Sequence, residues 1–487
     1  MLFNSIDFAI FLPIVFGLFW ALKSRGLAWQ NGILLAASYF FYGWWDWRFL
    51  GLIAFSTVVD FAVGNGLSKT SKPTSRKLLL WISIAVNLGL LGYFKYANFF
   101  IENFAQAFSL LGTPMQADRL NIILPVGISF YTFQTMSYTI DVYRKALEPT
   151  RNFLAFSTYV AFFPQLVAGP IERATNLLPQ FYSERTFDYS KAVDGMRQIL
   201  WGLFKKVVIA DNCAQFANEM FNNTAQHNGI SLTIGAVFFA FQIYGDFSGY
   251  SDIAIGTARL FGFNLMQNFA FPYFSRDIAE FWRRWHISLS TWFRDYLYIP
   301  LGGSRGSKAR VVRNVFIIFL VSGFWHGANW TFLVWGGLNA LYFLPLLLSD
   351  KNRSHIGDIA AHSTLPSLRE AIQMLLTFGL TVLAWIFFRA ESLTHAFQYI
   401  RSIPGSYFTK LNYYLTLEDL HRHFHLPILL MLVAAILIEW SGRHNKHALV
   451  SFGLSWHPLI RRSAYLAIAF GIFLFGGQQA EFIYFQF

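Results

Sequence analysis

The chain has 487 residues, of which 55% are hydrophobic and 13% charged, and its formal net charge is +12. An ordinary soluble domain has roughly 25% charged residues, so this composition indicates a polytopic membrane protein. The single cysteine, Cys213, excludes an internal disulfide and a cysteine-rich metal site. The basic residues lie in short clusters between apolar runs. This pattern suits contact with anionic lipid headgroups and excludes a basic nucleic-acid-binding domain.

Apolar runs that could cross a membrane follow one another in the first third of the chain. They are residues 8–22, 32–45, 49–66, 78–100 and 122–143. Asp7 precedes the first run and Lys23 and Arg25 follow it, whereas a cleavable secretory signal carries its positive charge first. Basic clusters also follow the third and fifth runs. This alternation predicts a retained first helix, an N-terminus on the periplasmic side and cytoplasmic basic loops.

Polar and helix-breaking residues interrupt the apolar pattern in the next stretch. We expect Asp60 and Asp141 to accept hydrogen bonds or to act as counter-ions inside the helix bundle. Residues 162–173, FFPQLVAGPIER, contain two prolines and a glycine, which predicts a re-entrant or interfacial segment enclosed by protein. Residues 195–216 carry two adjacent lysines among apolar residues, which predicts an interfacial or tilted helix.

A polar cluster ends the apolar run at residues 230–247. The sequence there, GDFSGYSDIAIG, contains Asp246, Ser248, Ser251 and Asp252. These side chains suit a cavity wall, a cation site or hydrogen bonds between helices. Because no further ligands follow at a defined spacing, hydrogen bonding is the favoured interpretation and a metal site the weaker one.

Residues 274–313 predict an aromatic, basic helix followed by a basic loop. On a helical wheel its residues separate into an apolar face and a cationic face, with His286 at the border. The apolar face carries Trp282, Trp285, Leu289, Trp292 and Tyr296, and the other carries Arg283, Arg284, Ser290 and Arg294. A helix lying at the cytoplasmic headgroups would explain the same pattern. The loop sequence GGSRGSK lacks the GxxxxGK spacing, which argues against a nucleotide-hydrolysing P-loop.

The apolar stretch 314–348 predicts one spanning helix with His326 near its middle. Twelve residues separate His326 from Asn314, which is roughly 18 Å along a helix and near the centre of a hydrocarbon core about 30 Å thick. An ionisable group at that depth is a functional candidate. The alternative, a buried histidine bonded to a neighbouring helix, is equally compatible with the residues alone.

If that helix is continuous, His326 belongs to a small polar face. Ser322, Asn329 and Trp330 would share the face with it. Three small residues, Gly323, Gly327 and Ala328, would leave room for a ligand.

The remainder of the chain predicts a polar loop and three further spans. The spans are residues 372–388, 426–440 and 464–477. A cluster of histidines, His421, His423 and His425, precedes the second of them. Its alternate spacing suits an extended loop, and no neighbouring ligands complete it, so a metal site there is disfavoured.

Signatures of several enzyme classes are missing. The chain contains no GxSxG elbow, no HExxH zinc motif and no GxGxxG in a βαβ setting. What remains is His286 and His326 among aromatic residues, beside a basic loop that suits an anionic donor. A histidine's ordinary pKa of about 6.5 suits proton abstraction near neutrality. These features fit acyl transfer to a hydroxyl, and they also fit a proton-coupled transporter.

Four segments resemble the membrane-bound O-acyltransferase (MBOAT) family, most closely its bacterial alginate O-acetyltransferase branch. They are FWRRWHISLSTWFRDYLYIPLGG at 281–303, SGFWHGANWTFLVWGGLNAL at 322–341, and the motifs at 162–173 and 245–256. The opening MLFNSIDFAIFLP and the closing EFIYFQF are similar to that branch as well, so the resemblance covers essentially the whole chain.

The resemblance implies an all-α polytopic membrane protein, with a bundle of about 11–13 transmembrane or re-entrant helices around a funnel or tunnel. We expect one integral membrane domain over residues 1–487. It would comprise N-terminal spans at 1–150, a catalytic core at 151–348 and C-terminal spans at 349–487. The expected location is the bacterial inner membrane.

The resemblance also implies roles for individual residues. The family's catalytic histidine falls on His326 and a second characteristic histidine on His286. His326 would act as general base, while His286 and Asn329 would orient the donor or stabilise the oxyanion. Further candidate binding residues are Ser322, Trp325, Arg283, Arg284 and Arg294, of which the arginines would hold the donor's phosphates.

The implied chemistry is acetyl transfer from acetyl-coenzyme A, or another cytoplasmic acyl thioester, without a bound cofactor or metal. The implied acceptor is an exported polysaccharide such as alginate, and periplasmic SGNH-hydrolase-like partner proteins would complete delivery. Other envelope polymers (cellulose, peptidoglycan or teichoic acid) remain alternative acceptors. A non-enzymatic transporter or scaffold remains the alternative from another class.

Overall fold

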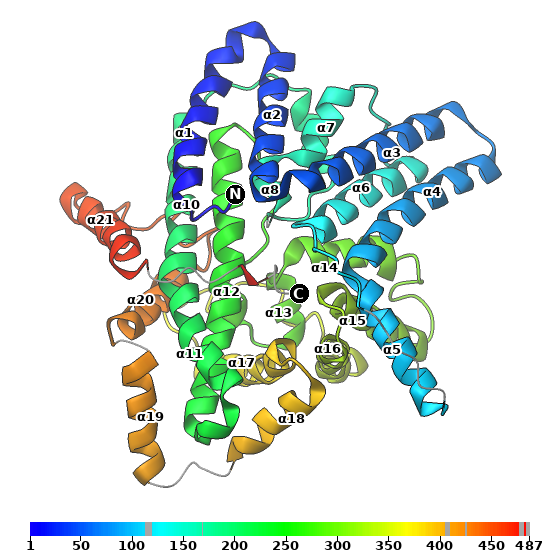
Figure 1. Cartoon of the computed structure of the whole chain (residues 1–487). Coiled ribbons are helices and arrows are strands. Elements are labelled where there is room, and N and C mark those ends of the chain that lie inside the picture. The colour runs from blue at the N-terminus through cyan, green and yellow to red at the C-terminus, as the bar shows by residue number, and fades with distance from the viewer. Residues whose placement is uncertain (113–118, 168, 405–409, 424–425, 477–481, 484–487) are drawn as a thin grey trace. The chain divides into compact units, whose positions relative to one another are not determined.

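The computed structural model describes residues 1–112, 119–167, 169–404, 410–423, 426–476 and 482–483, and within these ranges all regular secondary structure is helical (Figure 1). The chain divides into two compact units. Unit 1 comprises Met1–Gly195 and Thr257–Met266, and unit 2 comprises Met196–Gly256 and Gln267–Phe487. The two units are defined by contacts in space, whereas the three predicted segments are defined by the pattern of apolar and polar residues along the sequence. The single-domain assignment stays a prediction.

Unit 1 is built from apolar helices joined by short connections. Its elements are α1 (Ile6–Ala21), η1 (Leu22–Arg25), α2 (Leu27–Asp46), η2 (Trp47–Phe49), α3 (Leu50–Lys69), α4 (Pro73–Leu91), η3 (Gly92–Tyr96), α5 (Ala97–Leu110), α6 (Ile128–Tyr143), α7 (Phe153–Ala161), α8 (Phe163–Leu166), α9 (Ala174–Leu177) and η4 (Leu178–Phe181). Helices α3, α4 and α6 pack side by side, and α2 packs against α1 and α7 (Figure 1).

Unit 2 carries most of the remaining helices, and α10 and α12 each have one end in unit 1. The elements are α10 (Tyr189–Leu203), η5 (Phe204–Ala210), α11 (Asp211–Asn222), η6 (Thr224–Gln226), α12 (Gly229–Leu260), η7 (Pro272–Phe274), α13 (Ile278–Arg284), α14 (Ile287–Phe293), η8 (Arg294–Tyr298), α15 (Lys308–His326), α16 (Trp330–Leu348), α17 (Leu368–Arg389), α18 (Leu393–Ser402), α19 (Lys410–His423), α20 (Leu426–Gly442) and α21 (Pro458–Phe475).

Among the described residues, 8 helical stretches are long and apolar enough to cross a membrane. They are Ile6–Arg25, Leu27–Lys69, Pro73–Leu110, Gly229–Leu260, Lys308–His326, Trp330–Leu348, Leu368–Arg389 and Pro458–Phe475. Two shorter apolar helices, Phe153–Leu166 and Pro427–Gly442, accompany them. The predicted all-helical, multi-pass architecture is therefore confirmed. The predicted funnel and the count of 11–13 helices stay predictions.

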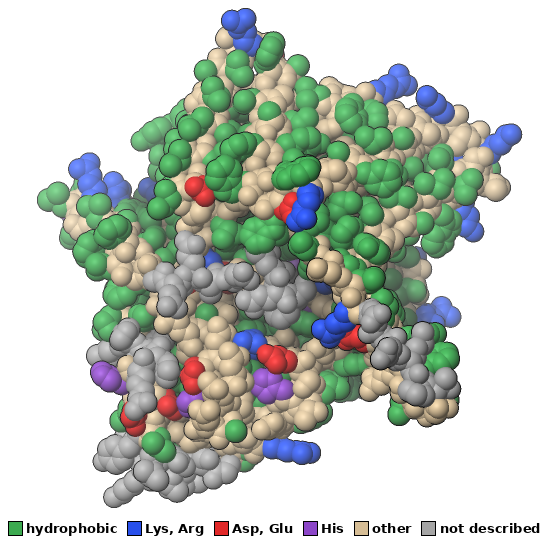
Figure 2. All heavy atoms as spheres, in the orientation of Figure 1, with side chains coloured by type: hydrophobic (Ala, Val, Ile, Leu, Met, Phe, Trp, Pro, Cys, Tyr) green, Lys and Arg blue, Asp and Glu red, His purple; other side chains and the backbone are tan. Residues whose placement is uncertain are grey.

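Helix α1 illustrates why the outer surface of unit 1 suits lipid. One face buries Phe8, Phe11, Val15 and Phe19, and the opposite face exposes the equally apolar Ile6, Ile10, Ile14 and Leu18. A helix that is apolar on both faces avoids water only in a membrane or a large core. Hydrophobic side chains likewise cover the visible faces of α1 to α4, and basic side chains gather near the α1–α2 and α3–α4 connections (Figure 2).

The hydrogen bonding of Asp60 and the enclosure of residues 162–173 by protein are confirmed, whereas the re-entrant or interfacial placement of that segment stays a prediction. Asp60 is buried and accepts hydrogen bonds from Ser83, from Asn87 at 2.9 Å and from Thr139 at 3.0 Å. The segment FFPQLVAGPIER breaks after α8 into irregular backbone whose described residues are buried. Buried Glu172 holds that backbone by accepting the Met266 N–H at 2.5 Å.

Two features of unit 2 go beyond the sequence pattern. Helix α12 contains the apolar run at 230–247 and continues through the polar cluster to Leu260. Lys205 and Lys206 of η5 are buried inside the protein, and the predicted interfacial or tilted placement of this segment stays a prediction. Buried carboxylates compensate their charges, as described below, and no local sequence pattern reveals such non-local partners.

The predicted C-terminal spans correspond to α17, α20 and α21, although α20 is among the shorter apolar helices. The predicted histidine cluster is only partly described. His421 lies in α19, whereas the side chain of His423 and all of His425 lie outside the described residues.

Candidate active site

The stretch that contains His326 is two helices rather than one, so the prediction of a continuous span over 314–348 is wrong. Helix α15 ends at His326, and the backbone at Gly327 is extended. Asn329 then caps α16, its side-chain oxygen accepting the Thr331 N–H at 3.0 Å. Asparagine is a strong helix N-cap, and this competing local structure ends the first helix. Asn329 and Trp330 therefore do not share a helical face with His326, whereas Ser322 does.

Gly323 and Gly327 serve helix packing, which corrects the expectation that these two glycines leave room for a ligand. Helices α15 and α16 pack against each other. A methyl group on Gly323 would lie 2.3 Å from the carbonyl oxygen of Phe332, and one on Gly327 would lie 2.0 Å from the Phe332 ring. A methyl group on Gly336 would lie 2.3 Å from the Phe319 carbonyl oxygen. Only glycine permits this backbone approach, so the space belongs to the neighbouring helix.

His326 lies in an aromatic enclosure and is 3% exposed. Its ring centroid lies 4.9 Å from that of Trp325, 5.1 Å from that of Trp335 in α16 and 5.3 Å from that of Phe388 in α17. The planes of all three neighbouring rings are steeply inclined to the plane of the His326 ring. Sequence reasoning missed Trp335 and Phe388, because both lie in uniformly apolar helices that carry no local signal of a site.

His286 lies at a break between two short helices, which corrects the predicted continuous amphipathic helix. Helix α13 ends at Arg284, His286 adopts left-handed backbone with φ 43°, and α14 begins at Ile287. A non-glycine residue in this region is unusual and marks a conformation that tertiary contacts impose. The residue is 1% exposed, so the break directs the imidazole into the protein interior.

Asn268 holds this break in place. On one side of the bend the Ala270 N–H donates to the Arg284 carbonyl at 2.9 Å, and on the other the Ile287 N–H donates to the Asn268 carbonyl at 2.9 Å. The Asn268 side-chain oxygen accepts the Ser288 hydroxyl at 2.9 Å, and its amide donates to Ser251 at 3.0 Å. Sequence reasoning missed Asn268, since a single asparagine in a loop has no distinguishing pattern.

The structure brings the two predicted histidines together. Their ring centroids lie 6.4 Å apart with an interplanar angle of 56°. Trp325 borders both rings, with its centroid 6.1 Å from that of His286. The edge of Phe247 meets the His286 ring at a centroid distance of 4.6 Å. Two imidazoles at this spacing can contact one small reacting group between them, because a hydrogen bond spans about 3 Å.

Burial gives His286 a defined charge state. Loss of hydration lowers its pKa to about 3, because the charged imidazolium is disfavoured in the interior. The ring is therefore neutral near pH 7, with one nitrogen able to donate a hydrogen bond and the other able to accept one. A neutral donor of this kind suits stabilisation of a developing oxyanion.

Two of the predicted donor-binding residues, Asn329 and Arg283, donate hydrogen bonds to backbone carbonyl groups. The Asn329 amide donates to the Glu391 carbonyl at 2.9 Å, in addition to its capping role. The guanidinium of Arg283 donates to the carbonyl oxygens of Asn352 at 2.9 Å and His355 at 2.8 Å. Both side chains therefore stabilise the fold through these hydrogen bonds. The predicted role of Asn329 and Arg283 in donor binding stays a prediction.

The other two arginines differ in availability. Arg284 is ion-paired with buried Glu280 at 3.0 Å and donates to the Ala270 carbonyl at 3.1 Å. Arg294 is paired with Asp295 at 2.7 Å, but 59% of its side chain is exposed. Of the three predicted phosphate-binding arginines, Arg283 and Arg294 are exposed, but the guanidinium of Arg283 already donates to two carbonyl oxygens.

The basic loop before α15 lines a cavity of about 450 Å³. Lys308, Asp350 and Arg353 contribute charged side chains to its wall, and the Lys308 ammonium donates to the Leu348 carbonyl at 3.2 Å. Lys308 begins α15 and His326 ends it, so the two lie about 27 Å apart along the helix. The mid-membrane depth predicted by counting from Asn314 assumes a continuous helix and stays a prediction.

The polar cluster on α12 forms hydrogen bonds and ion pairs, as favoured from the sequence. Lys206 pairs with Asp246 and Asp211, each at 2.7 Å, and Lys205 pairs with Asp252 at 2.7 Å. Among the residues that the structure describes, no group of three or more His, Cys, Asp or Glu side chains could hold a metal ion. The cluster therefore ties α12 to η5 inside unit 2.

Comparison with known proteins agrees with the resemblance of the motifs. The model of the MBOAT, membrane-bound O-acyltransferase family, matches residues 48–382. A probable alginate O-acetylase AlgI of Azotobacter vinelandii is 42% identical over 82% of this chain and 77% of its own length. One of Pseudomonas putida is 36% identical over 100% of both chains. A peptidoglycan O-acetyltransferase of Helicobacter pylori is 33% identical over 100% of this chain and 98% of its own.

The family match spans both histidines and the helices that position them. The chain belongs to the membrane-bound O-acyltransferase family and is a multi-pass membrane acyltransferase.

Proposed function

We propose that the protein moves acetyl groups from a cytoplasmic thioester, such as acetyl-coenzyme A, across the membrane for O-acetylation of an exported polysaccharide, with alginate as the leading acceptor. The names of the Azotobacter and Pseudomonas relatives support the acetyl group and the acceptor. Family membership sets aside the transporter or scaffold alternative, because the family consists of acyltransferases.

The observation that carries the proposal is the convergence of His286 and His326 at 6.4 Å inside an aromatic enclosure. Acyl transfer needs a base for the hydroxyl proton and a donor for the carbonyl oxygen that becomes negative. The two rings provide both functions on either side of one reacting carbonyl. The aromatic walls keep bulk water away, which limits hydrolysis of the thioester.

In the proposed mechanism, His326 accepts the proton of the attacking hydroxyl while its oxygen bonds to the thioester carbonyl carbon. The carbonyl oxygen gains negative charge and accepts a hydrogen bond from neutral His286. The tetrahedral intermediate then expels sulfur, and the proton on His326 passes to the leaving thiolate. The products are an ester and a free thiol, and His326 returns to its starting state.

Placement in the cell follows from the same proposal. Basic residues after the first, third and fifth predicted spans support cytoplasmic loops there and a periplasmic N-terminus in the inner membrane. Acetyl groups passed to the outer side would then be delivered to the polymer by periplasmic partner proteins of the SGNH-hydrolase-like type. The exposed guanidinium of Arg294, and Lys308 and Arg353 in the cavity at the start of α15, are candidate contacts for the donor's phosphates.

A His326→Ala variant tests the catalytic part of the proposal. We expect its acetyl transfer to fall about 10²–10⁴-fold, the usual contribution of a positioned base. His362→Ala is the matched control, because His362 is an exposed loop residue. The measurements are release of free thiol from acetyl-coenzyme A by the purified protein and ester content of the polymer in cells. Unchanged acetylation in a folded His326→Ala protein would exclude the catalytic role.

Peptidoglycan is a second candidate acceptor. The full-length match to the Helicobacter pylori peptidoglycan O-acetyltransferase favours it. Deleting the gene and measuring base-labile acetate separately in secreted polysaccharide and in purified peptidoglycan distinguishes the acceptors. Loss of acetate only from peptidoglycan would replace the alginate assignment and leave the acyltransferase mechanism unchanged.

A further inference from the structure

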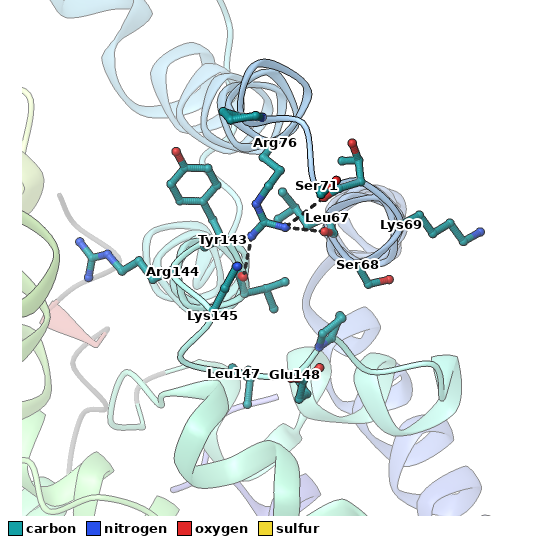
Figure 3. A pocket seen from close by; sticks show the side chains of 14 residues that line it. Leu67, Ser68, Lys69, Ser71, Arg76, Tyr143, Arg144, Lys145, Leu147 and Glu148 are labelled. Carbon is teal, nitrogen blue, oxygen red and sulfur yellow. Dashed lines mark hydrogen bonds between the residues drawn. The ribbon is translucent and has the colours of Figure 1, made fainter.

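A basic cavity lies within unit 1, whereas both histidines belong to unit 2, and the cavity has no role in the proposed reaction. It has a volume of about 830 Å³ and lies where the α3–α4 connection meets the end of α6 (Figure 3). Four basic residues line it, together with one acidic residue: Lys69, Arg76, Arg144, Lys145 and Glu148. The cavity wall therefore carries a clear excess of positive charge.

Arg76 is fixed at the centre of this wall. Its guanidinium donates to the Leu67 carbonyl at 2.5 Å and to the Tyr143 carbonyl at 2.9 Å (Figure 3). Leu67 belongs to α3 and Tyr143 ends α6, so the arginine ties two helix ends together. Carbonyl dipoles satisfy its hydrogen-bonding groups without neutralising its full charge. The positive charge of Arg76 is thus held rigidly beside the cavity.

Lys145 occupies a backbone position that favours glycine. Its φ is 60°, and the end of α6 forms a Schellman motif in which the Lys145 N–H donates to Val142 at 3.1 Å and the Ala146 N–H to Asp141 at 2.9 Å. Glycine is the usual residue at this left-handed position, because a side chain is strained there. Lysine at this position provides a charged side chain, but its backbone is more strained than that of glycine would be.

The side chain of Lys145 faces another cation. In the view of Figure 3 its ammonium end points toward the guanidinium of Arg76. Like charges repel, and no described carboxylate pairs with the Lys145 ammonium. An anion between the two groups would relieve that repulsion. Phosphate suits this place, since guanidinium and ammonium groups are its common partners.

The neighbouring surface of α4 suits acyl chains. Beginning two residues after Arg76, this helix exposes Leu78, Trp81 and Ile82. An anion bound at Arg76 and Lys145 would thus have an apolar helix face directly beside it. Basic pockets next to apolar helices are characteristic sites for anionic lipid headgroups.

We propose that this cavity binds a phosphate-bearing anion, with Arg76 and Lys145 as its main contacts. Its expected form is the headgroup of an anionic phospholipid whose chains lie along α4. The same phosphate chemistry is also offered by a soluble phosphate compound. The site is independent of acetyl transfer, so its test and that of the proposed function can fail separately.

The test compares lipid retention by the delipidated full-length protein in detergent. Phosphatidylglycerol and phosphatidylcholine are added at equal concentration and bound lipid is counted by native mass spectrometry. The variants are Lys145→Gly, which removes the ammonium and suits the left-handed backbone, and Lys77→Ala. Lys77 is an exposed basic residue of α4 that does not line the cavity, so it controls for loss of surface charge.

Wild type and Lys77→Ala should prefer phosphatidylglycerol, whereas Lys145→Gly should lose about fivefold in retention, as expected for one basic residue near a membrane surface. Its thermal unfolding midpoint should not fall, because the backbone strain is relieved. Equal retention by all three proteins would overturn the proposal, as would equal losses in both variants.

A second experiment uses inorganic pyrophosphate as a soluble phosphate compound. If it binds with the same dependence on Lys145 and displaces the lipid, the ligand is a soluble phosphate and the lipid assignment is overturned.

Discussion

The imidazole rings of His286 and His326 meet at 6.4 Å although the residues lie 40 positions apart in the chain. Each ring is positioned by a helix break rather than by a helix interior. His286 precedes the first turn of α14, and His326 is the last residue of α15. Burial keeps His286 neutral, and His326 is the proposed base, so the two histidines have different roles.

The unequal roles predict how His286 responds to pH. Because burial lowers its pKa to about 3, His286 does not change charge between pH 5 and 8. Replacing it with alanine should reduce turnover about 10²–10³-fold, as for loss of one oxyanion donor, without altering the shape of the pH–rate profile in that range. The measurement is acetyl transfer at half-unit pH intervals. Disappearance of an acid limb in His286→Ala would show that this ring titrates there and would contradict the assignment.

The same lowered pKa makes stability depend on pH. In the unfolded chain His286 takes up a proton below about pH 6.5, whereas in the fold it does so only near pH 3. Stability from this group is therefore present above pH 6.5 and declines as pH falls toward 3, with a slope of at most about 1.4 kcal/mol per pH unit. Thermal unfolding of wild type and His286→Ala at pH 4.5 and 7.5 checks this. The variant should show the smaller acid-induced loss, and an equal loss would contradict the prediction.

Asn268 provides a test of whether the bend at His286 matters for catalysis. Asn268→Ala removes the hydrogen bonds to Ser251 and Ser288 that hold the start of α14. We expect turnover to fall about 10–100-fold with little change in the Michaelis constant for the donor, because a displaced imidazole weakens the transition state more than binding. Ser290→Ala is the control, since its hydroxyl makes one long bond of 3.4 Å to Trp285. A rise in the Michaelis constant alone would instead assign Asn268 to donor binding.

The sequence could predict the helical class, the multi-pass architecture and both histidines, because these depend on composition and on motifs of adjacent residues. It could not predict the bend at His286, since a helical wheel assumes continuity and the bend depends on Asn268, 18 positions away in the chain. The end of α15 could in principle have been predicted from the sequence. Gly327 and the capping residue Asn329 are local stop and start signals, but the uniform apolarity around them favoured a single span.

The partners of the arginines could not be predicted for a related reason. A cationic face on a wheel predicts charge but not its partner, and Arg283 donates to carbonyls 69 and 72 positions away. Lys205 and Lys206 show the same limit, because carboxylates on α12 turn two apparent interface residues into buried ones. Local sequence patterns do not show which distant residue will neutralise or bond a charged side chain.

Substitution of Lys206 should destabilise the fold more than substitution of most other basic residues in unit 2. Its ammonium is buried between Asp211 and Asp246, so Lys206→Met leaves two carboxylates without their counter-charge. Removing one partner of a buried ion pair costs about 3–5 kcal/mol. Lys191→Met is the control, because its pair with Asp188 is exposed and long at 3.9 Å, and such surface pairs contribute little to stability. Thermal unfolding in detergent measures both, and equal shifts would contradict the assigned burial.

The contact between α15 and α16 can be tested with two adjacent glycines. A methyl group on Gly336 would lie 2.3 Å from the Phe319 carbonyl oxygen, whereas one on Gly337 would meet nothing closer than Leu320 at 3.9 Å. Gly336→Ala must therefore separate the helices, and we expect a loss of about 1–3 kcal/mol, as for overpacking. Gly337→Ala should be neutral or slightly stabilising, because alanine favours helix.

The same pair of variants connects packing to the site. Trp335, which borders the His326 ring at 5.1 Å, precedes Gly336 directly. A shift of α16 in Gly336→Ala would displace this wall, so acetyl transfer should fall together with the thermal midpoint, while Gly337→Ala retains both. If Gly336→Ala lost stability but kept full activity, the Trp335 wall would not be needed for the reaction. The aromatic enclosure would then serve folding alone.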